Sequence, residues 1–416
     1  MARVKKLSTR ANFAWTALGR ASYGACQWAI LVVLAKLGSL AMLGRFSLAL
    51  AVTAPVMVFL NLHLRNLYAT DSGSRFPFAT YQRLRNRLTT LGLILCIGIA
   101  TFGEFPLWTR LAIVAMAAAK AIESLQDLHY GVFQRFGGMD SYGRSLFLRG
   151  SLGLLALAAL VYTTGRVTWG LAGMAGAWAV VLVFVDRPNA GRIRRMRTTA
   201  VPNVSHETLT LARLAAPLGI VHLLDSLNAN IPRYFLDYRL NADALGIFVP
   251  MTYLFTIGSA FVFALGAPLA PRLAEYYRAG DRLGYRDLAL KLLALAAAMG
   301  IAGVVFAWLL GPWFLALAYT EAHAAHGTAF IWVMGAGGLH YIMVISQYNL
   351  IAARALGVQS ILYLLTTVVT TWASWIWIGQ RGVEGAAQGM TLGLALGVAA
   401  TMAVSVRVWS TMSRST

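Results

Sequence analysis

Residues 12–35 have the sequence NFAWTALGRASYGACQWAILVVLA, and the second half of this stretch is apolar enough to lie in lipid. A helix that crosses a bilayer needs about 20 predominantly apolar residues, and the stretch has that length. Arg20 nevertheless stands in its middle, where a charge left in hydrocarbon costs at least about 2.5–3.5 kcal/mol. The stretch therefore predicts a membrane helix that keeps one polar face away from lipid.

The polar side chains of this predicted helix share a single face. At 100° per residue, Asn12, Thr16, Arg20, Tyr23 and Gln27 fall on one narrow stripe, and the rest of the surface is apolar. Two interpretations of the arginine remain open at this point. It is either a structural residue paired inside a helix bundle or a cation that lines a cavity.

The composition of the whole chain indicates a membrane protein. Of 416 residues, 58% are hydrophobic and 12% are charged, whereas soluble domains carry about 25% charged residues. A net charge of +20 would suggest nucleic-acid binding in a soluble protein, but basic residues also collect in the cytoplasmic loops of membrane proteins. The two cysteines, Cys26 and Cys96, lie in apolar segments and offer neither a disulfide framework nor metal-ligand spacing. We therefore predict an all-α polytopic membrane protein with no nucleic-acid partner.

Apolar segments recur along the chain and predict about twelve transmembrane helices. More than two thirds of the 35 Lys and Arg residues fall on one side if the N-terminus is cytoplasmic, which predicts that both termini are cytoplasmic. The start of the chain, 1–6, is basic and is interpreted as the flank of an uncleaved first helix. The predicted spans are 12–35, 40–62, 88–104, 108–133, 146–164, 168–185, 207–230, 244–269, 288–310, 327–350, 359–379 and 384–406.

The longest loop is basic and lies at the midpoint of the chain. It predicts an N-terminal six-helix lobe at 1–186, a cytoplasmic linker at 187–206 and a C-terminal six-helix lobe at 207–416. Both lobes would then enter the membrane in the same orientation, as in transporters built from parallel repeats with a substrate site between them.

The fourth span carries the densest group of charges, in AAAKAIESLQDLHYGVFQ at 117–134. Lys120, Glu123 and Asp127 share one helix face, so this face offers a cation and two carboxylates. Lys120 and Glu123 are spaced to form a self-neutralising structural pair. Several ionisable groups in one span also mark substrate or ion pathways, and both interpretations stay open. The same face adds hydrogen-bonding groups from Ser124, Tyr130 and Gln134.

Two further spans carry polar groups. The seventh has Arg213 near its start, followed by His222 and Asp225, whose spacing suits a proton-exchanging pair or a buried, hydrogen-bonded histidine. The tenth has His340 and Gln347 on one face, which fits either an aqueous lumen or ordinary bonding between helices. No Walker A, nucleophile-elbow or zinc signature occurs, so we expect no enzyme activity, no cofactor and no metal site.

Two stretches, at 12–56 and 214–254, resemble a known family of transporters. The second contains PLG, NANIPRYFL and LGIF elements that are moderately specific. Both stretches are similar to bacterial oligosaccharide and polysaccharide flippases of the multidrug/oligosaccharidyl-lipid/polysaccharide (MOP) superfamily, which include the Wzx-type O-antigen translocases. The resemblance implies a MATE-like, V-shaped bundle of two six-helix lobes in the bacterial inner membrane.

The resemblance also implies a function and partners. The chain would move undecaprenyl-pyrophosphate-linked oligosaccharide from the cytoplasmic to the periplasmic leaflet by alternating access, for surface polysaccharide, O-antigen or lipopolysaccharide biosynthesis. A polysaccharide polymerase and other glycan-assembly proteins would be its partners. The alternatives are a multidrug/ion antiporter of the same superfamily, a membrane polysaccharide polymerase or ligase, and a scaffold that transports nothing.

Helix geometry then predicts three groups of site residues. Basic groups attract a pyrophosphate, and we assign that role to Arg20, Lys120 and Arg213. The candidates for ion or proton coupling are Glu123, Asp127, His222 and Asp225. The predicted polar lining comprises Asn12, Thr16, Tyr23, Gln27, Ser124, Tyr130, Gln134, His340 and Gln347.

Overall fold

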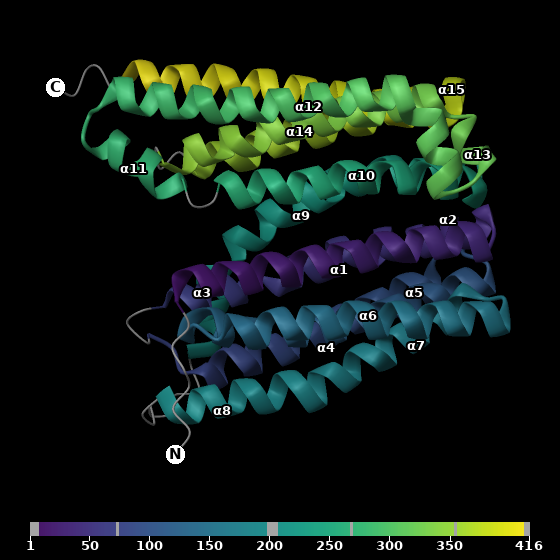
Figure 1. Cartoon of the computed structure of the whole chain (residues 1–416), viewed down its shortest axis with the longest axis horizontal. Helices are drawn as coiled ribbons and strands as arrows, with labels where there is room; N and C mark the ends of the chain where they lie inside the picture. Colours follow the sequence, from purple (N-terminus) through teal and green to yellow (C-terminus); the bar gives the residue numbers. More distant parts are fainter. Residues whose placement is uncertain (1–7, 72–74, 198–206, 267–268, 353–355, 412–416) are drawn as a thin grey trace. The chain divides into compact units, whose positions relative to one another are not determined.

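The chain is built of α-helices (Figure 1). The computed structural model describes residues 8–71, 75–197, 207–266, 269–352 and 356–411, and these ranges contain no β-strand. Nine helices in the described ranges are long and apolar enough to cross a membrane. The prediction of an all-α polytopic membrane protein is therefore confirmed.

The chain divides into two compact units, Met1–Leu223 and Leu224–Thr416, and the division falls within helix α9 (Glu207–Arg239). The first part of the predicted linker is helical. Helix α7 (Val167–Val181) continues through a π-helical turn (Leu182–Asp186) into α8 (Arg187–Arg197), and the rest of the linker lies outside the described residues. The π-helical turn contains the buried Asp186, whose carboxylate accepts a hydrogen bond from Gln126 at 3.0 Å.

Helix α5 lies at the centre of the first unit. It packs against α2, α3, α4, α7 and α8, while α1 runs along α6, as Figure 1 shows. Because α5 has neighbours on most sides, its polar face is turned towards other helices of the unit. The remaining bounds are α1 Thr9–Leu37, α2 Leu40–Asn61, α3 Leu64–Thr70, α4 Phe78–Phe102, α5 Leu107–Phe136 and α6 Met139–Thr164.

Helix α14 has the corresponding place in the second unit, where it packs against α10, α11, α12 and α15. Helix α15 contains the last two predicted spans and bends at Gly382, whose φ of 60° lies in the region that favours glycine. The central helices α5 and α14 contain the fourth span of each half. The bounds are α10 Ala242–Gly266, α11 Ala270–Arg278, α12 Arg282–Ala318, α13 Glu321–Ala324, α14 Gly327–Ala352 and α15 Leu356–Thr411.

One helix boundary changes the interpretation of the site. Hydropathy predicts the third span at 88–104, whereas α4 begins at Phe78 and includes Arg83, Arg85 and Arg87. The difference arises because charged residues lower the mean hydropathy of a segment without ending the helix. Of these arginines, Arg85 is only 1% exposed, so it is a buried residue and not part of a solvated loop.

Two glycines allow α1 and α6 to approach closely. A Cβ atom built on Gly19 would lie 2.6 Å from the Cα atom of Gly143, and one built on Gly143 would lie 2.5 Å from the carbonyl oxygen of Trp15. Small residues at such contacts let membrane helices pack backbone against backbone. The α1–α6 contact therefore depends on the absence of side chains at these two positions.

We expect Gly19→Ala to lower the free energy of unfolding by about 1–3 kcal/mol, because the added methyl group forces the two helices apart. Thermal unfolding of the purified protein in detergent measures this effect. Gly24→Ala is a matched control on the same helix, since a Cβ atom there meets no atom of the described chain within 4 Å. The control should be neutral or slightly stabilising because Ala favours helix more than Gly does. Equal melting temperatures for the two variants would contradict the expectation.

Candidate functional site

The charged face of α5 forms the centre of a polar network in the first unit. The carboxylate of Glu123 accepts hydrogen bonds from three side chains. Lys120 Nζ lies 2.8 Å from its Oε2, and Arg149 Nη2 lies 3.1 Å from its Oε1. The Tyr23 hydroxyl donates to Oε1 at 3.4 Å. Arg149 is 4% exposed and also lies over the Tyr23 ring, 4.1 Å from its centroid. Glu123 thus joins α5 to both α1 and α6.

Asp127, one turn further along α5, pairs with two other arginines. Its Oδ1 lies 3.4 Å from Arg65 Nη1, and its Oδ2 lies 3.3 Å from Arg85 Nη2. Arg85 also donates to Asn61 Oδ1 and to Ser124 Oγ, and Ser124 donates to the same Asn61 oxygen. Several acceptors replace much of the hydration that a guanidinium loses when it is buried. Removal of one acceptor would leave part of the desolvation free energy of the charge uncompensated.

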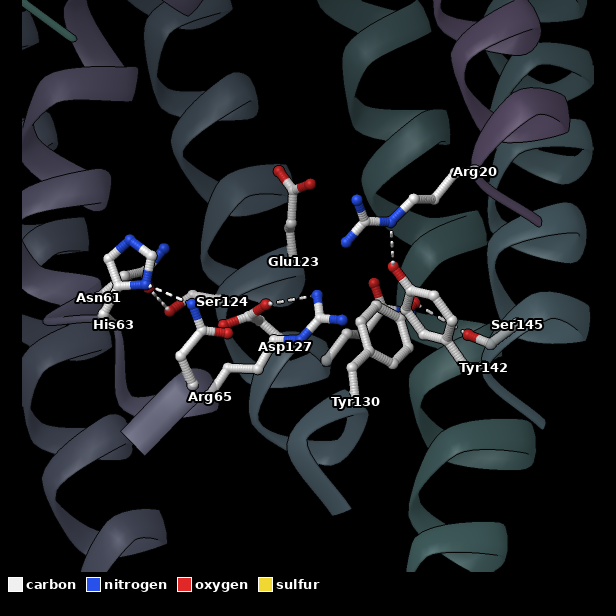
Figure 2. A network of polar contacts seen from close by, with 12 residues as sticks. Arg20, Asn61, His63, Arg65, Glu123, Ser124, Asp127, Tyr130, Tyr142 and Ser145 are labelled. Carbon is white, nitrogen blue, oxygen red and sulfur yellow. Dashed lines mark hydrogen bonds and ion pairs between the residues drawn. The ribbon is translucent and has the colours of Figure 1, made fainter. Parts of the chain in front are cut away.

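Arg20 of α1 belongs to the same network and lies on the side of Asp127 opposite to Asn61 and Ser124 (Figure 2). Its Nε donates to the Tyr142 hydroxyl at 3.3 Å, and Tyr142 in turn lies under the guanidinium of Arg65, whose Cζ is 5.0 Å from the ring centroid. Figure 2 shows Asn61, His63 and Ser124 to one side of Asp127 and the Arg20–Tyr142 pair to the other. The predicted stripe on α1 therefore meets the predicted face of α5 through Tyr23, whereas Arg20 of the same stripe bonds to Tyr142 of α6.

A cavity of about 500 Å³ opens onto this network within the first unit. Its polar wall includes six of the predicted residues, together with others that the sequence did not indicate. The lining residues are Arg20, Ala54, Met57, Val58, Asn61, His63, Arg65, Asn66, Lys120, Glu123, Asp127, Gln134 and His222.

The polar network carries more positive than negative charge, and three of its cations, Arg20, Arg65 and Lys120, line the cavity. We define the cationic cluster as Arg20, Arg65, Arg85, Lys120 and Arg149 with the carboxylates of Glu123 and Asp127, and it has five positive charges against two negative ones. In a region of reduced dielectric constant, such an excess attracts an anion more strongly than it would in water. The cavity is therefore suited to bind an anionic group.

The other predicted residues of the first unit do not line this cavity. Ser124 is buried inside the network, and Tyr130 is buried with its hydroxyl 2.9 Å from Ser145 Oγ. Thr16 donates to the backbone oxygen of Asn12 at 2.7 Å, within its own helix. The remaining two are Gln27, which is half-buried on α1, and Arg213, which is exposed on α9 and does not line the cavity.

The predicted residues of α9 and α14 have separate surroundings. The ring of His222 lies against that of His63, with centroids 3.8 Å apart and the ring planes tilted by 37°. Asp225 belongs to the second unit and interacts electrostatically with His340, which packs edge-on against Phe255. Gln347 is buried in the second unit, where its backbone oxygen accepts from the Gln359 amide at 3.3 Å.

Several members of the site are not predicted from the sequence: Asn61, Arg65, Arg85, Tyr142 and Arg149. Arg65 and Arg85 lie just outside the predicted spans 40–62 and 88–104, and Arg149 lies near the start of the span 146–164, where basic residues are usually a signal of topology. One available signal was the presence of two carboxylates in a single span, because buried carboxylates need cations from other helices.

Comparisons with known proteins agree with this architecture. No family model matches the chain. A capsular polysaccharide biosynthesis protein from Staphylococcus aureus, CapF, is 22% identical over 361 residues, which cover 86% of this chain and 85% of CapF.

Solved structures give the fold. A multidrug resistance MATE family transporter of the MOP superfamily, in an inward-facing conformation, superposes with a TM-score of 0.73 at 15% identity and covers 96% of both chains. A MOP superfamily transporter from Pyrococcus furiosus, described as having a binding pocket of reverse polarity, matches with a TM-score of 0.61 at 16% identity and covers 96% of this chain and 95% of its own. The chain is thus a membrane protein with the transporter fold of the MOP superfamily.

Proposed function

We propose that the protein flips undecaprenyl-pyrophosphate-linked oligosaccharide across the bacterial inner membrane by alternating access, for the biosynthesis of a surface polysaccharide. The observation that carries the proposal is the cationic cluster at a cavity in a chain with a MOP transporter fold. Similarity to a capsular polysaccharide biosynthesis protein supports the same class of substrate. A pyrophosphate is the anionic part of such a substrate, and cations on a cavity wall would hold it.

Arg20 is the cation best placed to contact the substrate. Its side chain is exposed and lines the cavity, and the hydrogen bond from Nε leaves the two terminal nitrogens of its fork for a ligand. Figure 2 shows these nitrogens pointing towards the middle of the network. Arg85 and Arg149 are almost fully buried in ion pairs, so we assign them the role of positioning Asp127 and Glu123.

The two carboxylates are the proposed coupling groups. Each bridges two cations, so protonation of Glu123 would release Lys120 and Arg149 together. Proton or ion binding at this point would therefore change the charge offered to the substrate, which is what coupled transport requires. His222 and Asp225 remain further candidates, on the helix within which the two units divide.

We propose the same domain organisation and topology that the sequence predicts. Two six-helix lobes would be joined by the basic cytoplasmic segment 187–206, with both termini in the cytoplasm, and a polysaccharide polymerase and other glycan-assembly proteins would act with the transporter. Arg213 would act as a further cation of the pathway.

We expect Arg20→Gln to reduce flipping about tenfold, the loss that corresponds to one charge-assisted hydrogen bond. The measurement is the rate at which lipid-linked oligosaccharide becomes accessible on the opposite leaflet of reconstituted vesicles. Arg286→Gln, at an exposed arginine of α12, is the control and should leave the rate unchanged. Exposure of the glycan at the same rate in protein-free vesicles would overturn the proposal. A wild-type rate of flipping in Arg20→Gln would show that Arg20 does not bind the substrate.

The multidrug antiporter alternative makes the opposite prediction about charge. A cationic drug would be repelled by a cavity with an excess of positive charge. Uptake of a cationic dye by vesicles that contain the protein, driven by an ion gradient, would therefore favour the antiporter over the flippase.

A further inference from the structure

A second hollow lies on the first unit, along the contact between α1 and α6. It has a volume of about 610 Å³, and its walls are apolar, from Trp15, Leu18, Phe147 and Leu148. Two wall residues are largely exposed, Leu18 at 67% and Phe147 at 54%. We call this hollow the α1–α6 groove; its remaining lining residues are Gly19, Ser22, Gly143 and Arg144.

The groove exists because its floor has almost no side chains. Gly19 and Gly143 bring the two backbones together, and Ser22 turns its hydroxyl back to the Gly19 carbonyl oxygen at 3.0 Å. Large apolar side chains of both helices line the rest of the groove. An apolar groove with exposed walls, on two helices that are long enough to cross a membrane, is suited to bind a hydrocarbon chain.

One end of the groove is charged. Arg144 is exposed, and its guanidinium carbon lies 5.3 Å from the centroid of the Trp15 ring. Both residues stand in the second turn of their helices, at the ends that the basic-loop pattern places on the cytoplasmic side. An arginine beside a tryptophan at this depth lies where phospholipid headgroups lie, and its charge complements a phosphate.

We propose that the α1–α6 groove binds an anionic phospholipid of the bilayer, with one acyl chain along the apolar walls and the phosphate at Arg144. The groove and the cavity have no lining residue in common, although both are lined by α1. Arg20 lines the cavity, whereas Gly19 and Ser22 line the groove. The lipid site therefore does not depend on the proposed function of the cavity.

The test is lipid binding to the purified full-length protein in detergent, followed by native mass spectrometry and by the shift in melting temperature. The probes are dioleoylphosphatidylglycerol, dioleoylphosphatidylcholine and glycerol 3-phosphate. We expect the anionic lipid to bind about tenfold more tightly than the zwitterionic one, through a charge-assisted contact. Arg144→Gln should remove that preference. Ser22→Leu should lower the affinity for both lipids, because the larger side chain fills the floor of the groove.

A matched control tests whether the lipid preference requires the groove or arises at any exposed arginine–tryptophan pair. Arg166 is exposed and lies 3.8 Å from the centroid of the Trp108 ring, and neither residue lines the groove. Arg166→Gln should therefore leave the lipid preference intact. Equal affinity of the wild type for both lipids, or an unchanged preference in Arg144→Gln, would overturn the proposal. Binding of glycerol 3-phosphate as tight as that of the lipid would also overturn it, because the apolar walls would then contribute nothing.

Discussion

Reversal of charge at two positions of the cavity, with Arg20→Glu and Lys120→Glu combined, is expected to reduce flipping of lipid-linked oligosaccharide by at least about a hundredfold. The cationic cluster would change from five positive and two negative charges to three positive and four negative. The pyrophosphate would lose two attractive contacts and meet two repulsive ones, and each contact is worth about tenfold or more.

The rate of leaflet exposure in reconstituted vesicles measures this loss. The control keeps the charges and exchanges the side chains, Arg20→Lys with Lys120→Arg, and should retain most of the activity because the electrostatic excess is unchanged. Melting temperatures of both double variants must be measured as well, since Lys120 also pairs with Glu123. A folded charge-reversed protein that flips its substrate at the wild-type rate would contradict the proposed function.

Asp127→Asn is expected to lower the free energy of unfolding by about 3 kcal/mol. The substitution keeps the shape of the side chain but removes the charge shared by Arg65 and Arg85. Arg85 is 1% exposed, and removal of one partner from a buried ion pair leaves an uncompensated charge, which costs about 3–5 kcal/mol. The expected loss lies at the lower end of this range because Asp127 is 28% exposed and the asparagine oxygen still accepts hydrogen bonds.

Thermal unfolding in detergent measures the effect, and the exposed pair Lys291–Asp287 supplies the control. Its side chains are 72% and 64% exposed, so Asp287→Asn should leave the stability almost unchanged, because solvent screens an exposed ion pair. In the double variant Asp127→Asn with Arg85→Met, part of the stability should return because the buried charge has gone. Equal losses in Asp127→Asn and Asp287→Asn would show that burial of Arg85 does not determine the cost.

Much of the fold could be predicted from the sequence, since apolar length and the alternation of basic loops indicate helices that cross a membrane. The charged face of α5 was also predictable, because Lys120 and Glu123 are three residues apart and such pairs meet on any helix. The helical wheel places a residue on a face but does not say which helix packs there. For that reason Arg213 was grouped with Arg20, although it is exposed on α9 away from the cavity.

The sequence by itself determined that this is an all-helical membrane protein and that α1 and α5 each carry a polar stripe. Only the tertiary structure decided how the carboxylates are neutralised. Arg85 and Arg149 reach Asp127 and Glu123 from other helices, 42 and 26 residues away along the chain. Periodicity reports the burial of one face within a single helix, whereas an ion pair between helices depends on how those helices are packed.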